Sequence, residues 1–132
     1  MKEMTYGQLL SEMERLSEKL VRTCCDKGIR LATAESCTGG MISAAVTAVS
    51  GSSAVIELGV CSYSNRIKEK VLGVSAQTLK LYTEYSVQCA EEMARGVRAA
   101  ASAQLGISTT GVAGPTGGTA EHPVGEVCIA VC

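Results

Sequence analysis

The sequence predicts an α/β fold, a three-layer α/β/α sandwich around a mixed, mostly parallel sheet. Short apolar segments alternate with segments of helical period along the chain, which is the pattern of strands and helices in such a sandwich. Hydrophobic residues make up 46% of the 132 residues, but aromatic residues make up only 3%. A core of small aliphatic side chains is typical of a sheet buried between helices. This length predicts a single domain, residues 1–132.

The N-terminal segment is predicted to form an amphipathic helix. Thr5 and Gln8 have the spacing of a capping box, and Gly28 suits the left-handed end of a helix. Between them leucine and methionine recur at helical spacing, while charged residues fill the other face. We expect a short strand over Ile29–Thr33 and then a helix over Met41–Val49. That helix is apolar nearly all round, so we expect it to be buried.

The second half of the chain continues this alternation. We expect a strand over Leu58–Tyr63, a polar helix ended by Gly73, helices capped by Ser75 and Ser86, a strand over Gly106–Thr110, a glycine-rich loop over Gly111–Pro123, and a strand over Val124–Cys132. The last strand is apolar on both faces after its polar start, so we expect it to be covered on both sides.

Charge and hydropathy exclude several classes of function. The net charge of −1 gives no electrostatic reason to expect a nucleic-acid partner. No apolar run reaches the roughly 18 residues of a membrane span, so we expect no membrane association. The charged, amphipathic N-terminus differs from a signal peptide. We therefore expect a cytoplasmic protein.

Seven cysteines raise the question of a metal site or disulfides. They form no C-x-x-C pair, and one histidine is too few to complete a zinc site. We expect reduced thiols that act as small core residues, with no metal and no cofactor.

Polar residues cluster where three of the predicted strands end. These stretches are Glu35–Gly40, Tyr63–Lys68 and Thr110–Gly118. Ligands of open α/β sheets bind at the carboxyl ends of the strands. We therefore expect the three stretches to converge on one site.

The residue inventory narrows the chemistry of that site. Asp26 is the only aspartate and His122 the only histidine, which disfavours a Ser-His-Asp triad. Neither a paired-carboxylate site nor a phosphate-loop motif is present. What remains is a serine whose base is a lysine or a tyrosine.

Ser36 is the candidate nucleophile because it lies at a strand-to-helix turn. There the backbone N–H groups of Thr38–Gly40 are placed to stabilise an oxyanion. Lys68 is the candidate base if burial lowers its pKa, and Tyr63 is a candidate proton relay or hydrogen-bond partner of the nucleophile.

Plainer roles remain open for each of these residues. Ser36 could simply cap a helix, Lys68 could be a solvated surface lysine, and Tyr63 could be a strand residue with a wet hydroxyl. Cys37 is a rival nucleophile, but it lacks a recognisable histidine partner and ranks below Ser36. The loop that starts at Gly111 could cradle a phosphate or be an ordinary turn.

Taken together, these stretches resemble the C-terminal domain of the CinA (competence/damage-inducible protein A) family. The matching segments are Ala34–Gly40, Gly51–Ala54, Tyr63–Asn65 with Lys68, Leu72–Val74, Thr110–Pro115 and Pro123–Gly125. They occur in the family's order and spacing and cover nearly the whole chain. The resemblance implies a three-layer sandwich in which the strand after Pro123 is antiparallel to the others.

The resemblance also implies an activity. Stand-alone members of the family are nicotinamide-nucleotide amidohydrolases, which convert nicotinamide mononucleotide to nicotinate mononucleotide and ammonia in pyridine nucleotide recycling. The family's Ser-Lys dyad carries over to Ser36 as nucleophile and Lys68 as general base, with Tyr63 assisting. The residues expected to bind this small nucleotide substrate are Glu35, Thr38, Gly39, Gly40, Asn65, Thr110, Gly111, Ala113 and Gly114.

The chain departs from the family pattern in two ways. Arg66-Ile67 stands where Glu-Ala is usual, and His122-Pro123 stands where Lys-Pro is usual. Family domains also continue past Cys132 with a strand, a Gly-Asp-Arg stretch and a helix, so we expect a fold that lacks this last strand and helix. The final strand then becomes a sheet edge, which favours a homo-oligomer. A second hypothesis follows, a catalytically silent nucleotide-binding or assembly module of the same fold.

Overall fold

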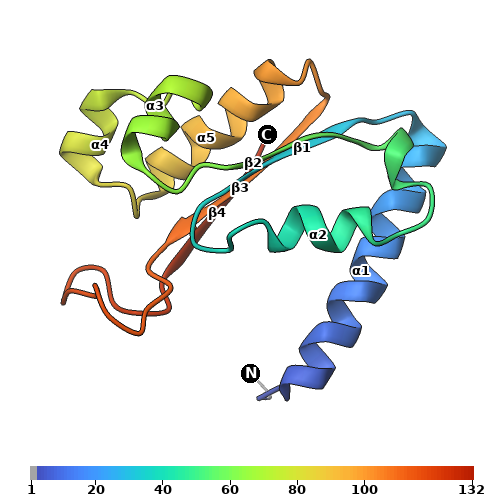
Figure 1. Ribbon diagram of the computed structural model, residues 1–132, viewed down its shortest axis with the longest axis horizontal. Helices are drawn as coiled ribbons and strands as arrows, with labels where there is room; N and C mark the ends of the chain where they lie inside the picture. Colours follow the sequence, from blue (N-terminus) through green and yellow to red (C-terminus); the bar gives the residue numbers. More distant parts are fainter. Residues whose placement is uncertain (1–2) are drawn as a thin grey trace.

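A four-stranded mixed sheet lies at the centre of the computed structural model, which describes residues 3–132 (Figure 1). The strands are β1 Leu31–Glu35, β2 Ile56–Cys61, β3 Leu105–Gly111 and β4 Val127–Val131. Their order across the sheet is β2-β1-β3-β4. β1 is parallel to both β2 and β3, whereas β4 is antiparallel to β3. The parallel strands end on the same edge of the sheet, which is where ligands of such sheets bind.

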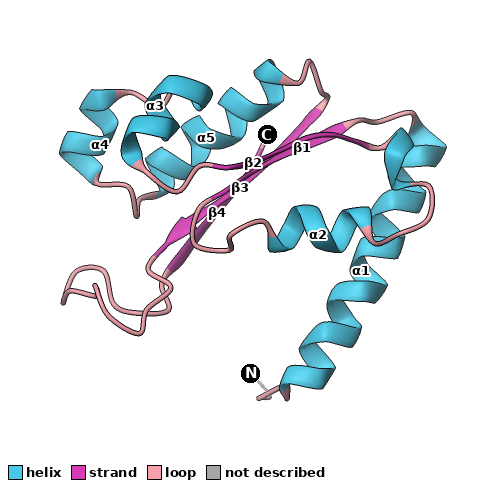
Figure 2. Ribbon diagram, in the orientation of Figure 1, coloured by secondary structure: helices cyan, strands magenta, loops and turns pink. Residues whose placement is uncertain are grey.

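Helices cover both faces of this sheet (Figure 2). One layer contains α1 Tyr6–Lys27, α2 Met41–Thr47 and the short 3₁₀ helix η1 Ser52–Ala54; the other contains α3 Asn65–Leu72, α4 Ala76–Tyr82 and α5 Val87–Ala100. The predicted three-layer α/β/α sandwich is therefore confirmed. The N-terminal part of α1 extends beyond the sheet (Figure 1).

The helix ends follow the local sequence signals. The amide of Gln8 donates to Thr5 Oγ1 at 3.3 Å, and the amide of Thr5 donates to Gln8 Oε1 at 2.9 Å, so the predicted capping box is present. Gly28 ends α1 with a φ of 62°, a left-handed conformation that glycine adopts without strain. Ser75 and Ser86 cap α4 and α5, as predicted.

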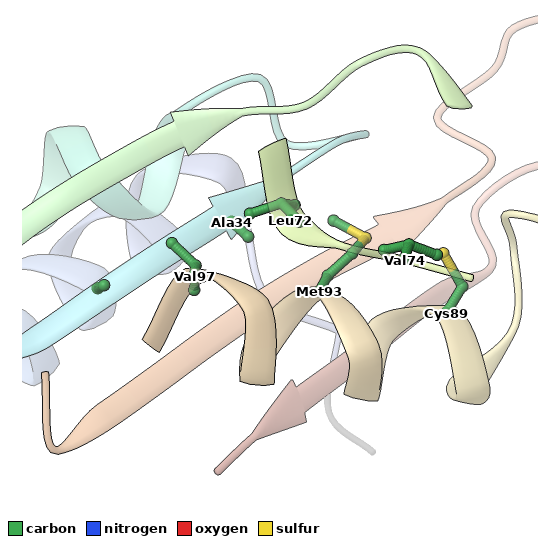
Figure 3. Packing of buried hydrophobic residues seen from close by; sticks show 7 residues of the cluster. Ala34, Leu72, Val74, Cys89, Met93 and Val97 are labelled. Atoms are coloured by element: carbon green, nitrogen blue, oxygen red, sulfur yellow. The ribbon is translucent and has the colours of Figure 1, made fainter. Parts of the chain in front are cut away.

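Two apolar clusters hold the layers together, one on each face of the sheet. On the face of the sheet that α5 covers, the cluster contains Ala34, Leu72, Met93 and Val97 (Figure 3). On the other face the cluster contains Val21, Leu31, Val46 and Val55. Each valine, leucine or methionine side chain that is fully removed from water stabilises the fold by about 1.5–3 kcal/mol.

Gly96 allows α5 to approach α3 closely. A Cβ at this position would lie 1.9 Å from the carbonyl oxygen of Leu72, at the end of α3. Any larger residue would push the two helices apart.

The first strand begins two residues later than predicted. The amide of Ile29 still donates to Cys24 O at 2.9 Å, so this residue completes the end of α1. At its other end, Glu35 pairs with Cys61 of β2 and Thr109 of β3. The strand therefore runs over Leu31–Glu35 rather than Ile29–Thr33.

β4 differs most from its predicted form. It begins at Val127 because Pro123 and Glu126 form a turn, in which the Glu126 amide donates to the Pro123 carbonyl at 3.1 Å. The prediction that both faces are covered is wrong. α5 packs on one face, but Val127, Ile129 and Val131 on the other are 45%, 65% and 62% exposed.

The predicted complete burial of the second helix is also wrong. α2 ends at Thr47, and Val46 is its one fully buried residue. Met41 at its start is 54% exposed. α1 covers only part of the outer surface of α2, so the rest of that surface is exposed to solvent. Within residues 3–132, no helix is long and apolar enough to cross a membrane.

Candidate active site

The three polar stretches at the carboxyl ends of β1, β2 and β3 meet at one pocket, as predicted from topology. The pocket has a volume of about 290 Å³. Its lining residues are Ser36, Cys37, Tyr63, Asn65, Lys68, Glu84, Tyr85, Gly111, Val112, Ala113, Gly114, Thr116 and Gly117. A larger hollow lies between α1 and α2. It contains none of these strand-end loops, so it is not the candidate site.

Ser36 and Lys68 are in direct contact in this pocket. Lys68 Nζ donates to Ser36 Oγ at 3.1 Å and to the carbonyl oxygen of Ser62 at 3.0 Å. Ser36 follows directly after β1, and its amide donates to Thr109 O of β3 at 2.9 Å. Lys68 lies one turn into α3, whose start is capped by Ser64. Both reactive atoms are therefore positioned by regular secondary structure.

Burial shifts the ionisation of Lys68 toward the neutral amine. The side chain is only 1% exposed. Desolvation disfavours the ammonium and lowers the pKa of Lys68; the charges of Cys89 and Glu84 act weakly in the opposite direction. A neutral amine has a lone pair, so it can accept the proton of the Ser36 hydroxyl. This side chain is not a solvated surface lysine.

Glu35 lies beside Ser36 in the chain, but its carboxylate points away from the pocket lining. It accepts four hydrogen bonds, from the amides of Ile42 and Ser43 and from the hydroxyls of Thr38 and Ser43, at 2.7–3.0 Å. Burial alone raises the pKa of Glu35, but these four donors outweigh that effect and hold the pKa below its usual value. The contacts of Glu35 are those of an anchor for the start of α2.

The turn after Ser36 is partly occupied by its own hydrogen bonds. The amide of Gly39 donates to Ser36 O at 3.0 Å, so in this conformation it is not free to stabilise an oxyanion. Thr38 donates to Glu35 Oε2, and its hydroxyl also contacts Thr109 Oγ1, each at 2.7 Å. Gly40 has a φ of 104° and is the N-cap residue of α2. Thr38, Gly39 and Gly40 shape the turn and are not among the lining residues.

The other predicted binding residues divide in the same way. Asn65, Gly111, Ala113 and Gly114 line the pocket. Thr110 does not, because its buried hydroxyl donates to Glu84 O at 2.6 Å. This bond fixes the loop between α4 and α5 to β3.

Tyr63 lines the pocket from the end of β2 and is 72% exposed. No hydrogen bond of its hydroxyl is present among the contacts of residues 3–132. Its predicted role as assistant to Ser36 and Lys68 therefore stays a prediction.

His122 supports the glycine-rich loop from outside the pocket. Its Nδ1 lies 2.9 Å from Glu126 Oε2, and its Nε2 lies 3.4 Å from Thr83 Oγ1. Its ring packs against that of Tyr85, with the centroids 5.7 Å apart. These contacts join the loop before β4 to the loop between α4 and α5, the two segments that form one wall of the pocket.

Sequence reasoning missed Glu84 and Tyr85. Both line the pocket, but they come from a loop between two helices rather than from the end of a strand. A pattern of polar residues at strand ends therefore does not indicate Glu84 or Tyr85. The one local signal was the start of α5 at Ser86, which implies a turn just before it.

The two thiols nearest to the candidate dyad, Cys37 and Cys89, are not activated. Burial raises the pKa of Cys37 beside Ser36, and it raises the pKa of Cys89 to about 11. A protonated thiol is a poor nucleophile, which favours Ser36 over Cys37. Across residues 3–132, no group of three or more His, Cys, Asp or Glu side chains could hold a metal ion.

Known proteins with the same architecture were found by sequence and by structure. A family model for the CinA C-terminal domain matches residues 13–132. The CinA-like protein of Anaeromyxobacter dehalogenans (strain 2CP-1 / ATCC BAA-258) is 47% identical over 118 residues, which cover 89% of this chain and 29% of that protein. The chain spans less than a third of the length of the curated relatives it matches.

Solved structures give the same result. The competence/damage inducible protein CihA from Agrobacterium tumefaciens superposes with a TM-score of 0.90 at 38% identity, covering 99% of this chain and 76% of that one. The competence damage-inducible protein A from Klebsiella pneumoniae subsp. pneumoniae MGH 78578 gives 0.87 at 39% identity, covering 90% and 74%. The family model and the solved structures agree: the chain belongs to the CinA C-terminal domain family.

Proposed function

We propose that this domain is an amidohydrolase that cleaves the carboxamide of nicotinamide mononucleotide, giving nicotinate mononucleotide and ammonia. One observation carries the proposal, the 3.1 Å contact between Ser36 Oγ and the Nζ of a lysine that is 1% exposed. A buried lysine with a lowered pKa beside a serine is an arrangement suited to nucleophilic catalysis. It needs neither a histidine nor a metal.

In the first half of the reaction, Ser36 attacks the carbon of the substrate's carboxamide. The neutral amine of Lys68 accepts the hydroxyl proton as the Oγ–C bond forms. The carbonyl oxygen of Ser62 accepts a hydrogen bond from Nζ, which keeps the lysine lone pair directed at Ser36. Lys68 then returns the proton to the leaving nitrogen, the C–N bond breaks, and ammonia departs from an ester on Ser36.

In the second half, water hydrolyses this ester. Lys68 accepts a proton from the attacking water and returns it to Ser36 Oγ as the C–O bond breaks. The product carries a carboxylate, and the enzyme regains its starting state. Ala113 and Gly114 line the same pocket as Ser36 and Lys68. We assign the binding of the mononucleotide's phosphate to this glycine-rich loop, where unpaired N–H groups suit an anion.

The test is ammonia release from nicotinamide mononucleotide by purified Ser36→Ala protein. We expect a loss of about 10³-fold or more, since no other hydroxyl is bonded to Lys68 Nζ. Ser53→Ala is the matched control, because Ser53 is exposed on η1 and does not line the pocket. Turnover by folded Ser36→Ala at the wild-type rate would overturn the proposal.

The outer edge of the sheet favours a second candidate, a catalytically silent nucleotide-binding or assembly module. β4 is an edge strand whose apolar side chains Ile129 and Val131 are 65% and 62% exposed. Such an edge invites pairing with a second copy. Calorimetric binding of the nucleotide without any ammonia release would favour this candidate over the hydrolase. Light scattering of Ile129→Lys protein tests the pairing, which we expect that change to weaken.

A further inference from the structure

The pocket beside Ser36 has walls that complement positive charge. Glu84 is the one acidic residue among its lining residues, and Tyr63 and Tyr85 contribute two electron-rich rings. Lys68 is the one basic residue among them, and burial drives it toward its neutral form. An ordinary anion-binding pocket has the opposite charge pattern.

Backbone hydrogen bonds hold Glu84 and Tyr85 at this wall. The Glu84 carbonyl accepts from Thr110 Oγ1 of β3. The Tyr85 carbonyl accepts from the Cys128 thiol of β4 at 3.2 Å. Ser86, the cap of α5, donates through its hydroxyl to Thr83 O at 2.9 Å. Both side chains are thus presented by a segment fixed to two strands and one helix.

Glu84 is half-buried, and the one basic residue that lines the pocket with it is Lys68, whose pKa is lowered by burial. None of the salt bridges formed among residues 3–132 includes Glu84. Burial and the charge of Glu84 both raise the pKa of Tyr85, which is the expected effect of a negative potential at this wall. A partly desolvated carboxylate that faces an open pocket attracts a cation from solution.

We infer that Glu84, with the faces of Tyr63 and Tyr85, selects amides carried on a positively charged aromatic ring. The substrate class is a quaternary pyridinium carboxamide, as opposed to a neutral aromatic carboxamide of the same shape. A carboxylate attracts the ring charge directly, and aromatic faces attract a flat cation through their quadrupoles. This inference rests on the proposed function, because it assigns the charge preference of the same pocket.

Two probes of matched shape test the inference. 1-Methylnicotinamide is a pyridinium cation, and 3-methylbenzamide is its neutral isostere, with carbon in place of the charged nitrogen. We expect the wild-type protein to bind the cation about tenfold more tightly, as the sum of one charge contact and one or two aromatic contacts. Raising the salt concentration should weaken binding of the cation and leave the neutral probe unchanged.

Variants locate the preference at Glu84. In Glu84→Gln we expect the ratio of the two affinities to fall about fivefold. Glu84→Asp keeps the charge, so its ratio of affinities should stay above the ratio measured for Glu84→Gln. Glu121→Gln is the control, since Glu121 is exposed and does not line the pocket. Equal wild-type affinity for both probes, or a ratio unchanged in folded Glu84→Gln, overturns the inference. If Glu84→Gln does not fold, the salt dependence of wild-type binding decides.

These results are separate from the test of the proposed function. Binding of the probes is measured without turnover, so a charge preference can be present in a protein that releases no ammonia. Conversely, ammonia release with no preference between the two probes would refute the role of Glu84 and leave the Ser36–Lys68 chemistry standing.

Discussion

Glu35 and Lys68 are two ionisable side chains buried on either side of Ser36, and they are treated in opposite ways. Glu35 is 0% exposed and Lys68 is 1% exposed. Four donors surround the carboxylate of Glu35, so its ionised form is stabilised in spite of burial. Lys68 has two neutral oxygen partners and no carboxylate bonded to it. Burial therefore lowers the pKa of Lys68 and shifts it toward its neutral form.

The difference shows that burial alone does not decide whether a charged residue is structural or reactive. What decides is how many partners compensate the charge. Glu35 is fully compensated and anchors the turn that carries Ser36. Lys68 is under-compensated, and the lone pair it gains makes it a base.

The largest effect we predict is on turnover. Lys68→Met should reduce ammonia release by at least about 10²–10⁴-fold, the usual contribution of a general base. Lys70→Met, two residues along the same helix but exposed, should retain wild-type activity. A Lys68→Met protein that is folded and fully active would show that the buried amine is not the base.

The second prediction concerns the anchor. Glu35→Gln replaces two acceptor oxygens with one and directs an N–H₂ group at backbone donors, so the free energy of unfolding should fall by about 3 kcal/mol. Glu57→Gln, which breaks the exposed pair of Glu57 with Arg30, should cost less than about 1 kcal/mol. Urea unfolding measures both changes. Equal costs would mean that the four hydrogen bonds to Glu35 contribute nothing special.

The pH dependence of the Glu35 contribution has a definite sign. The folded-state pKa lies below the usual value of 4.5, so the native state binds fewer protons than the unfolded state. The stabilisation is complete above 4.5 and is lost as the pH falls through the folded value. Wild-type and Glu35→Gln stabilities should therefore converge in acid.

The third prediction tests the close contact between α5 and α3. In Gly96→Ala the new Cβ would meet Leu72 O, 1.9 Å away, so α5 must separate from α3, at a cost of about 2 kcal/mol. In the control Gly7→Ala, nothing lies within 4 Å of the new Cβ, and the helix should gain stability slightly. Thermal unfolding compares the two proteins. A stable Gly96→Ala protein would mean that the contact between these helices can relax freely.

The smallest effect is on stability at Lys68 itself. Because the folded-state pKa is below 10.5, the unfolded state binds more protons between the two values, and wild-type stability rises with pH in that window. Lys68→Met should be more stable than wild type by about 1 kcal/mol near neutral pH. The gain should shrink as the pH approaches 10.5. A gain that is constant with pH would mean that the lysine ionises equally in both states.

Much of this site was predictable from local sequence. The strand ends and the shortage of histidine and aspartate made Ser36 and Lys68 candidates, the family resemblance gave them the roles of nucleophile and base, and the structure brings their reactive atoms to 3.1 Å. The helix ends at Thr5 and Gly28 were predictable for the same reason, since caps depend on a few adjacent residues.

Properties that depend on distant segments were not predictable. The burial of Lys68 depends on segments that pack around α3, and α5 approaches α3 closely at Gly96. The direction of the Glu35 carboxylate depends on where α2 begins, and Glu84 reaches the pocket through a hydrogen bond from Thr110. The open face of β4 depends on which segment lies over it, and a strand that is apolar on both faces carries no such information.

The central claim is that Lys68 is a neutral base for Ser36, and titration of this one side chain tests it most directly. The protein would be labelled with ¹³C at the lysine Cε, with the Lys68 signal assigned by its absence from Lys68→Met protein. The account predicts a titration midpoint below 10.5, the ordinary value, in the folded wild-type protein. A midpoint at or above 10.5 in the folded wild-type protein would contradict the account.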